Sequence, residues 1–146
     1  MSTKSNRRKK NRAWMSELVA RTQQEPDRLL LTFVNMANAG ASTDITIDVG
    51  GSVYSGTLIG ATDYAKRVSD RMNAGLKKAF PTHTFPPLFD AIAQNAETFA
   101  TGFAHLDNVR RWADSGQHTP LNGGLLRVRL SEVRGWMPGS VTTERA

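Results

Sequence analysis

Three histidines, His83, His105 and His118, are the side chains best suited to acid–base chemistry in this sequence, and they lie far apart along it. No two of them have the HxH or HxxxH spacing that holds a metal ion on one strand or helix. His105 and Asp107 are two residues apart, which would place both on one face of a strand as a histidine–carboxylate pair. A packed or exposed histidine is the commoner case, so we expect His105 to be structural.

Other signatures of catalysis are missing from the sequence. It has no cysteine, which excludes disulfides, thiolate nucleophiles and cysteine-ligated zinc. No GxSxG, GxxxxGK[ST] or GxGxxG motif occurs, and the carboxylates are scattered. We therefore predict a protein that is not an enzyme and that has no metal or cofactor. A hydrolase-like activity would require a pocket around His105.

Basic side chains are concentrated at the start of the chain, and they account for the net charge of +6. Residues 1–12 contain six of the 19 basic residues and no acid, whereas the 13 basic residues that follow meet 13 acids. We expect residues 1–12 to form a disordered tail that solubilises the protein or contacts RNA, an acidic protein surface or anionic lipid. The cations of this tail are Lys4, Arg7, Arg8, Lys9, Lys10 and Arg12.

A second group of arginines lies late in the chain beside Trp112 and Trp136, where arginine and aromatic side chains together could stack on nucleic-acid bases. The alternative is that the tryptophans are core or subunit-contact residues and that the arginines pair with nearby acids. The neutral charge of residues 13–146 favours this alternative, because nucleic-acid-binding faces need clustered cations. The arginines are Arg110, Arg111, Arg127, Arg129 and Arg134.

Four segments have apolar residues at helical spacing. They predict helices over residues 14–24, from about 26 to 39, over 63–80 and from 87 to about 100. The last two would lie between the second and third strands of a sheet. They would therefore form a helical insertion.

Strict alternation of apolar and polar residues predicts a strand over 45–49, and a return strand over 53–59 follows the turn residues Gly50 and Gly51. Gly56, in the middle of the return strand, indicates a sharp bend or a close approach of two backbones. Later strands are predicted over 103–112, 125–130 and 133–137, with a polar loop at 114–124.

These elements predict an α+β fold. Its centre is a small, strongly bent antiparallel sheet or barrel with an N-terminal helical segment and a two-helix insertion between strands 2 and 3. We expect one domain over residues 13–140, with the insertion at about 62–100. Residues 1–12 would be the tail, and residues 141–146 would fray.

Two stretches of sequence resemble the gas vesicle accessory protein U (GvpU) family. The first is ITIDVGGSVYSGTLIG at residues 45–60. The second comprises HLDNV at 105–109 and NGGLLRVRLSEVRGWMPGS at 122–140. The resemblance covers about half of the chain. It implies a non-catalytic accessory protein that assists the assembly or association of gas vesicles by binding shell or assembly proteins.

A broader resemblance is to the Sm-like (Hfq-type) small β-barrel. It rests on an N-terminal helix, the hairpin VGGSVYSGTLIG at 49–60, and VRLSEVRGWMPG at 128–139. Members of that fold have a glycine in the bent second strand, where this chain has Gly56. They often form rings through their edge strands, so the resemblance implies a homo-oligomer and, as the alternative function, RNA binding through the tail and the late arginines.

The expected partners are proteins, with nucleic acid as the alternative. Trp14, Met15, Trp136 and Met137 are predicted to be exposed apolar contacts. No run of 18 apolar residues exists and no apolar segment follows the basic start, so neither a spanning helix nor a secretory signal is predicted. We expect a cytoplasmic protein.

Overall fold

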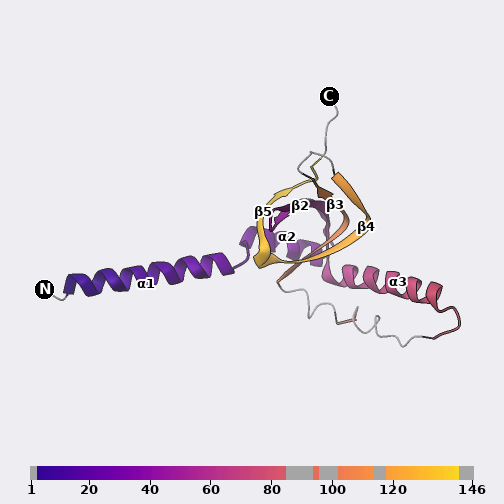
Figure 1. Cartoon of the computed structure of the whole chain (residues 1–146), viewed down its shortest axis with the longest axis horizontal. Coiled ribbons are helices and arrows are strands. Elements are labelled where there is room, and N and C mark those ends of the chain that lie inside the picture. Colours follow the sequence, from indigo (N-terminus) through magenta and orange to yellow (C-terminus); the bar gives the residue numbers. More distant parts are fainter. Residues whose placement is uncertain (1–2, 85–93, 96–101, 114–117, 142–146) are drawn as a thin grey trace, which may run out of the picture.

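The computed structural model describes residues 3–84, 94–95, 102–113 and 118–141. Figure 1 shows the strands curving together into one body, from which α1 extends to one side and α3 to the other. The elements, in chain order, are α1 (Thr3–Gln24), α2 (Arg28–Asn38), β1 (Thr43–Val49), β2 (Ser52–Ile59), α3 (Ala61–Ala79), β3 (Phe103–Trp112), β4 (His118–Arg129), the short 3-10 helix η2 (Leu130–Glu132) and β5 (Val133–Pro138).

The described strands form one antiparallel sheet in the order β4–β3–β2–β1–β5. β1 and β2 join through Gly50 and Gly51, whose φ angles of 60° and 87° lie in the region that glycine tolerates best. The amide of Gly51 also donates to Oδ1 of Asp48 at 3.0 Å, which helps to hold the turn. The predicted hairpin is confirmed.

The sheet bends where β2 passes β3. A Cβ atom on Gly56 would lie only 2.8 Å from the carbonyl oxygen of Asp107, so the two backbones approach as closely as they do only because this residue is glycine. Nearby, Asn108 has a positive φ of 50° and the register between the strands shifts, which marks a β-bulge. The close approach predicted from Gly56 is confirmed.

The α+β class and the bent antiparallel sheet are confirmed, but the described strands do not close into a barrel. β4 and β5 lie at the two ends of the strand order, and each has one described neighbour. The chain turns at η2, and β5 then runs along β1, with Ile47 opposite Trp136. Each end of the described sheet therefore presents an edge with backbone groups available for further pairing.

α2 covers the core face of the sheet. Its residues Leu30, Val34 and Ala37 are buried, and they recur at the helical spacing that placed this helix in the sequence. On the strands, alternate residues point to the same core, as the period of two requires. The strand and η2 residues of the core are Ile45, Ile47, Leu58, Ala104, Leu106, Val109, Val128 and Leu130.

The opposite face of the sheet contains a buried polar network. Ser55 Oγ lies 2.7 Å from Thr46 Oγ1 and accepts a hydrogen bond from Trp112 Nε1 at 3.1 Å. Thr46 Oγ1 donates to the carbonyl of Gly139 at 2.9 Å, so the Ser55 hydroxyl is the donor between the two hydroxyls. The amide of Val141 also donates to Ser55 Oγ, at 3.4 Å. The network holds the segment after β5 across β1 and β2.

α3 is the first helix of the predicted insertion. It begins at Ala61, whose amide donates to Oδ1 of Asn38 at 2.9 Å, so a residue of α2 caps α3. The second predicted helix, at 87–100, lies outside the described residues except for 94–95.

α1 reaches back to Thr3, so residues 3–12, which we expected to be disordered, are helical. Lysine and arginine have long unbranched side chains with high helix propensity, and the segment continues a helix that is already formed, so it needs no new nucleus. Of the predicted frayed end at 141–146, only Val141 is described.

β4 is longer than predicted. It begins at His118, opposite Trp112 of β3, so part of the expected polar loop at 114–124 pairs as a strand. The strand accommodates Pro120 because it lies at the edge of the described sheet. The register with β3 shifts before Gly124, which indicates a bulge. The polar residues from His118 to Gly124 therefore belong to an irregular edge strand, and not to a loop as we expected.

Candidate functional site

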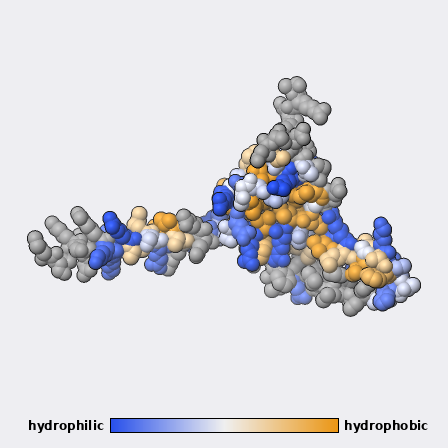
Figure 2. Space-filling view, viewed as in Figure 1, coloured by the Kyte–Doolittle hydropathy of each residue, from blue (hydrophilic) through white to orange (hydrophobic). Residues whose placement is uncertain are grey.

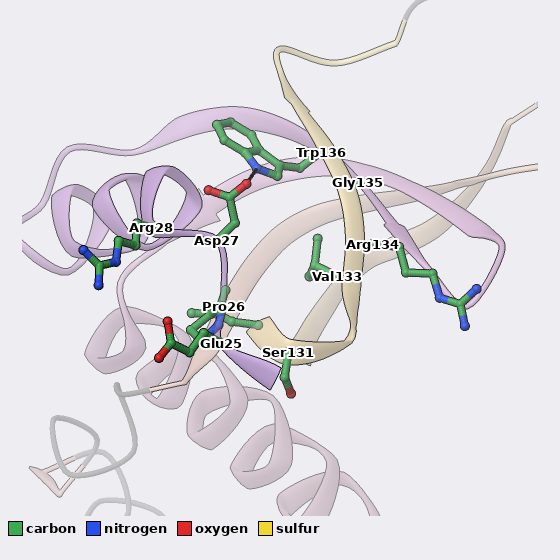
Figure 3. Close-up of a pocket in the computed structure, with 10 residues that line it drawn as sticks. Glu25, Pro26, Asp27, Arg28, Ser131, Val133, Arg134, Gly135 and Trp136 are labelled. Atoms are coloured by element: carbon green, nitrogen blue, oxygen red, sulfur yellow. Dashed lines mark hydrogen bonds between the residues drawn. The ribbon is translucent and has the colours of Figure 1, made fainter. Parts of the chain in front are cut away.

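An open groove of about 640 Å³ lies between β5 and the connection from α1 to α2 (Figure 3). Consecutive residues of β5 line it, although their side chains alternate between the two faces of a strand. The groove therefore follows the edge of the sheet and not one face. Its lining combines apolar with charged side chains, namely Pro26, Leu130, Val133 and Trp136 with Glu25, Asp27, Arg28 and Arg134.

Asp27 fixes the geometry of this groove by joining two distant parts of the chain. Its Oδ1 accepts from the amides of Leu29 at 2.8 Å and Leu30 at 3.2 Å, which makes it the N-cap of α2. Its Oδ2 accepts from Trp136 Nε1 at 3.1 Å (Figure 3). The hydrogen bond from Trp136 and those from the two amides lower the pKa of Asp27, because they stabilise the carboxylate.

Trp136 also packs edge-on against Phe33 of α2, with ring centroids 5.3 Å apart and ring planes at 62°. Its side chain is half-buried, so it both joins β5 to α2 and lines the groove. The next residue, Met137, is 48% exposed. Of the predicted contact residues on β5, Met137 is thus on the surface and Trp136 forms part of the groove wall.

The other two predicted contact residues lie on α1. Trp14 is 60% exposed and Met15 is 53% exposed, which agrees with their predicted accessibility. They lie on a helix that extends away from the sheet (Figure 1). The structure therefore places the four predicted contacts on two separate surfaces, one on α1 and one beside β5.

The two groups of cations are also separate. Arg127 and Arg129 of β4 lie over the ring of Phe103, with guanidinium carbons 3.9 Å and 5.4 Å from its centroid. Lys9, Lys10 and Arg12 are exposed on α1, whereas the side chains of Arg7 and Arg8 lie outside the described ones. Because α1 extends away from the sheet, the structure gives no support to a single RNA-binding surface formed by the tail and the late arginines.

His105 is buried on the face of the sheet that α3 covers. It is 2% exposed, and its ring centroid lies 4.6 Å from that of Tyr64 on α3. Burial, together with the nearby positive charge of Arg127, lowers the pKa of His105 to about 4, so the ring is neutral at physiological pH. Burial likewise raises the pKa of Tyr64.

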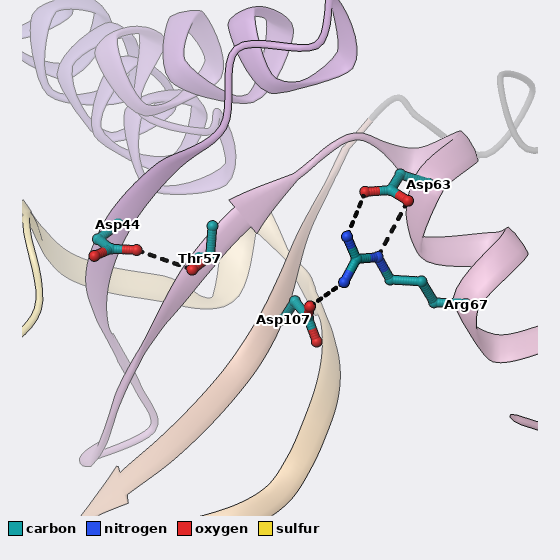
Figure 4. A network of polar contacts seen from close by, with 5 residues as sticks. All are labelled: Asp44, Thr57, Asp63, Arg67 and Asp107. Carbon is teal, nitrogen blue, oxygen red and sulfur yellow. Dashed lines mark hydrogen bonds and ion pairs between the residues drawn. The ribbon is translucent and has the colours of Figure 1, made fainter.

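Asp107, two residues after His105 on β3, binds an arginine of α3 instead of the histidine. Arg67 of α3 donates from Nη1 to Oδ2 of Asp107, and its Nε and Nη2 donate to the two carboxylate oxygens of Asp63 at 3.1 Å and 3.2 Å (Figure 4). On β1 and β2, Asp44 accepts from Thr57 Oγ1 at 2.9 Å. Asp107 therefore anchors α3 to the sheet, and the contacts of His105 and Asp107 with α3 have the form of a packing interface.

Sequence reasoning gave no site role to Asp27, Arg67 or Ser55, although each of them makes a polar contact between distant elements. Asp27 had a local signal, since aspartate before an apolar run is typical of an N-cap, but its bond to Trp136 spans 109 positions. Nothing in the neighbouring sequence indicates that Ser55 would be buried or that Arg67 would reach β3.

Two further observations concern the residues that the structure describes. Within them, no three histidine or acidic side chains come close enough together to hold a metal ion. None of the helices in this part of the chain combines the length and the hydrophobicity that crossing a bilayer requires.

The fold and the groove define a small α+β protein with a strongly bent antiparallel sheet and a shallow groove along an edge strand. A family model described as "Gas vesicle protein GvpU-like" matches residues 27–141. The chain therefore belongs to the GvpU-like family of gas vesicle proteins, as the sequence resemblance indicated. No curated protein and no solved structure matches the chain significantly.

Proposed function

We propose that this protein is a non-enzymatic gas vesicle accessory protein that assists the assembly or association of gas vesicles by binding a vesicle protein along β5. The observation that carries the proposal is the groove beside the edge of this strand. Membership of the GvpU-like family supports the connection to gas vesicles and a cytoplasmic location.

The groove suits an extended protein segment. The edge of β5 offers backbone donors and acceptors to an added strand, and such pairing gives affinity without specifying a sequence. Val133 and Trp136 offer apolar contact to side chains of the partner, which give specificity. Glu25 and Arg134 contribute charges of both signs, so a segment of uniform charge would meet repulsion at one of them.

The proposal can be tested by filling the groove without disturbing the fold. A side chain added at Gly135 has no atom within 4 Å of its Cβ, and Gly135 lines the groove. Gly75 on α3 is equally open and is far from β5 in the sequence, so Gly75→Leu is the matched control for Gly135→Leu. Both variants should retain the circular dichroism spectrum of the parent protein.

The probe is gas vesicles from the native host, mixed with each purified full-length protein and collected by flotation. We expect Gly135→Leu to weaken co-flotation about tenfold, as blocking a central contact does, and Gly75→Leu to leave it unchanged. Equal binding of both variants would refute the groove as the docking site. If Gly135→Leu abolished self-association but left vesicle binding intact, the edge of β5 would bind a second copy of this protein and not a vesicle protein.

A further inference from the structure

α1 differs from the rest of the molecule in charge. The helix contains seven basic residues and one acid, Glu17, whereas the residues outside it contain equal numbers of basic and acidic side chains. The net charge of +6 is thus the net charge of α1 alone. The region matched by the family model begins at Asp27, so α1 precedes the part of the chain that the model covers.

The half of α1 nearer the body also carries apolar surface, which is orange in Figure 2. Trp14 and Leu18, and likewise Met15 and Val19, are four residues apart and therefore lie on one side of the helix. Their exposed fractions are 60%, 47%, 53% and 51%, respectively. Large side chains at this spacing are the anchors by which helices bind in apolar grooves.

We propose that α1 is a docking helix whose partner is a protein with an apolar groove flanked by acidic side chains. The inference rests on the proposed function as a binding protein and adds a second surface with its own partner chemistry. The apolar anchors would enter the groove, and the cations of residues 4–12 would meet the acids beside it.

The distribution of side chains along α1 favours this partner over a membrane. A helix that lies on a lipid surface has its polar and apolar residues on opposite sides along its whole length. In α1 the two kinds of residue are separated along the axis instead, with six of the seven cations in residues 4–12 and the apolar stripe at 14–19. At 100° per residue, Lys9 lies on the side of the helix opposite the stripe, whereas Lys10 is four residues before Trp14 and lies in line with that residue. The cations are therefore not confined to one polar side of the helix.

A second copy and nucleic acid fit less well. The apolar stripe spans less than two helical turns, which is shorter than the three to four heptads of a coiled-coil seam. Pairing two α1 helices would also bring like charges together. Nucleic acid would use the cations, but the aliphatic side chains of Met15, Leu18 and Val19 have no role in contacts to phosphates.

The test begins in the native host with the full chain carrying a photo-crosslinking residue in place of Met15. The protein that is crosslinked is then purified, and its affinity for the full chain is measured at low and moderate salt. Lys9→Glu with Lys10→Glu should weaken binding about tenfold or more, and added salt should weaken it too, because the attraction is electrostatic. Lys77→Glu with Lys78→Glu on α3 makes the same charge change elsewhere and should have no effect.

Met15→Ala should also weaken binding, whereas Met72→Ala, which removes a comparably exposed methionine from α3, should not. A second set of measurements uses a 20-nucleotide oligouridylate and vesicles of phosphatidylserine with phosphatidylcholine. Tighter binding to either probe than to the protein, a crosslink mainly to another copy, or no crosslink would overturn the inference. Trp136→Ala separates the two surfaces, since loss of vesicle binding with the crosslink intact would leave α1 as an independent docking helix.

Discussion

Acidification should destabilise this protein through His105, which is neutral when folded and would take up a proton on unfolding. The folded protein holds the pKa of His105 at about 4, whereas an unfolded chain would restore the ordinary value of 6.5. Between these two values the unfolded state binds more protons than the folded state. The free energy of unfolding therefore keeps the full contribution of this residue above pH 6.5 and loses it as the pH falls toward 4.

The size of the effect follows from the difference between the two pKa values. It corresponds to about 3 kcal/mol in total, of which about 2 kcal/mol is lost between pH 7 and pH 4.5, at up to about 1.4 kcal/mol per pH unit. The loss arises because a protonated His105 would hold its charge in a buried position against Tyr64, with the positive charge of Arg127 nearby.

The measurement is urea unfolding, followed by tryptophan fluorescence at several pH values between 7 and 4.5. His105→Gln cannot titrate, so its free energy of unfolding should fall less than that of the parent protein by about 2 kcal/mol over this range. A single comparison of the slopes removes the contribution of the carboxylates, which both proteins share.

Parallel curves for the parent protein and His105→Gln would refute the reasoning. If His105→Gln does not fold, an NMR titration of the parent protein measures the pKa of His105 directly. The ring protons of His105 should shift near pH 4, and a midpoint close to 6.5 would show that the ring is not desolvated as the structure indicates.

Three substitutions test the other contacts by urea unfolding. Ser55→Ala leaves Trp112 Nε1 without its buried acceptor and should cost about 1–3 kcal/mol, and an unchanged midpoint would contradict the network. Asp27→Ala removes both the cap of α2 and the acceptor of an indole hydrogen bond. It should therefore lower the urea midpoint and alter the tryptophan emission, while Asp27→Asn should lower the midpoint less. Gly56→Ala forces a Cβ against a backbone oxygen and should cost about 1–3 kcal/mol, whereas Gly135→Ala meets no atom within 4 Å and should be neutral; equal effects would exclude the close approach.

The docking proposals place two different kinds of surface on one small protein. Apart from Glu25 and Pro26, the residues that line the groove beside β5 belong to the part of the chain that matches the family model, and α1 precedes that part. An edge strand binds through its backbone, while an exposed helix binds through its side chains. Variants of the two surfaces should therefore have independent effects, because they lie on separate elements.

The sequence by itself determined those features that depend on neighbours along the chain. Alternation and helical spacing located α2, α3 and the strand pair β1–β2, since each pattern reflects which side of one element meets apolar surroundings. Gly50, Gly51 and Gly56 indicated the turn and the bend, because only glycine accepts those backbone arrangements without a steric cost. The exposure of Trp14 and Met15 and the family resemblance also came from local sequence.

Only the tertiary structure decided what depends on residues that are distant in sequence. The bond from Trp136 to Asp27, the network around Ser55 and the contact of Arg67 with Asp107 all join separate elements, and strand register sets their distances. The low pKa of His105 arises from burial under α3, which no neighbouring residue encodes. The open edge of β5 has the same origin, because pairing along an edge is a property of the assembled sheet and not of the strand itself.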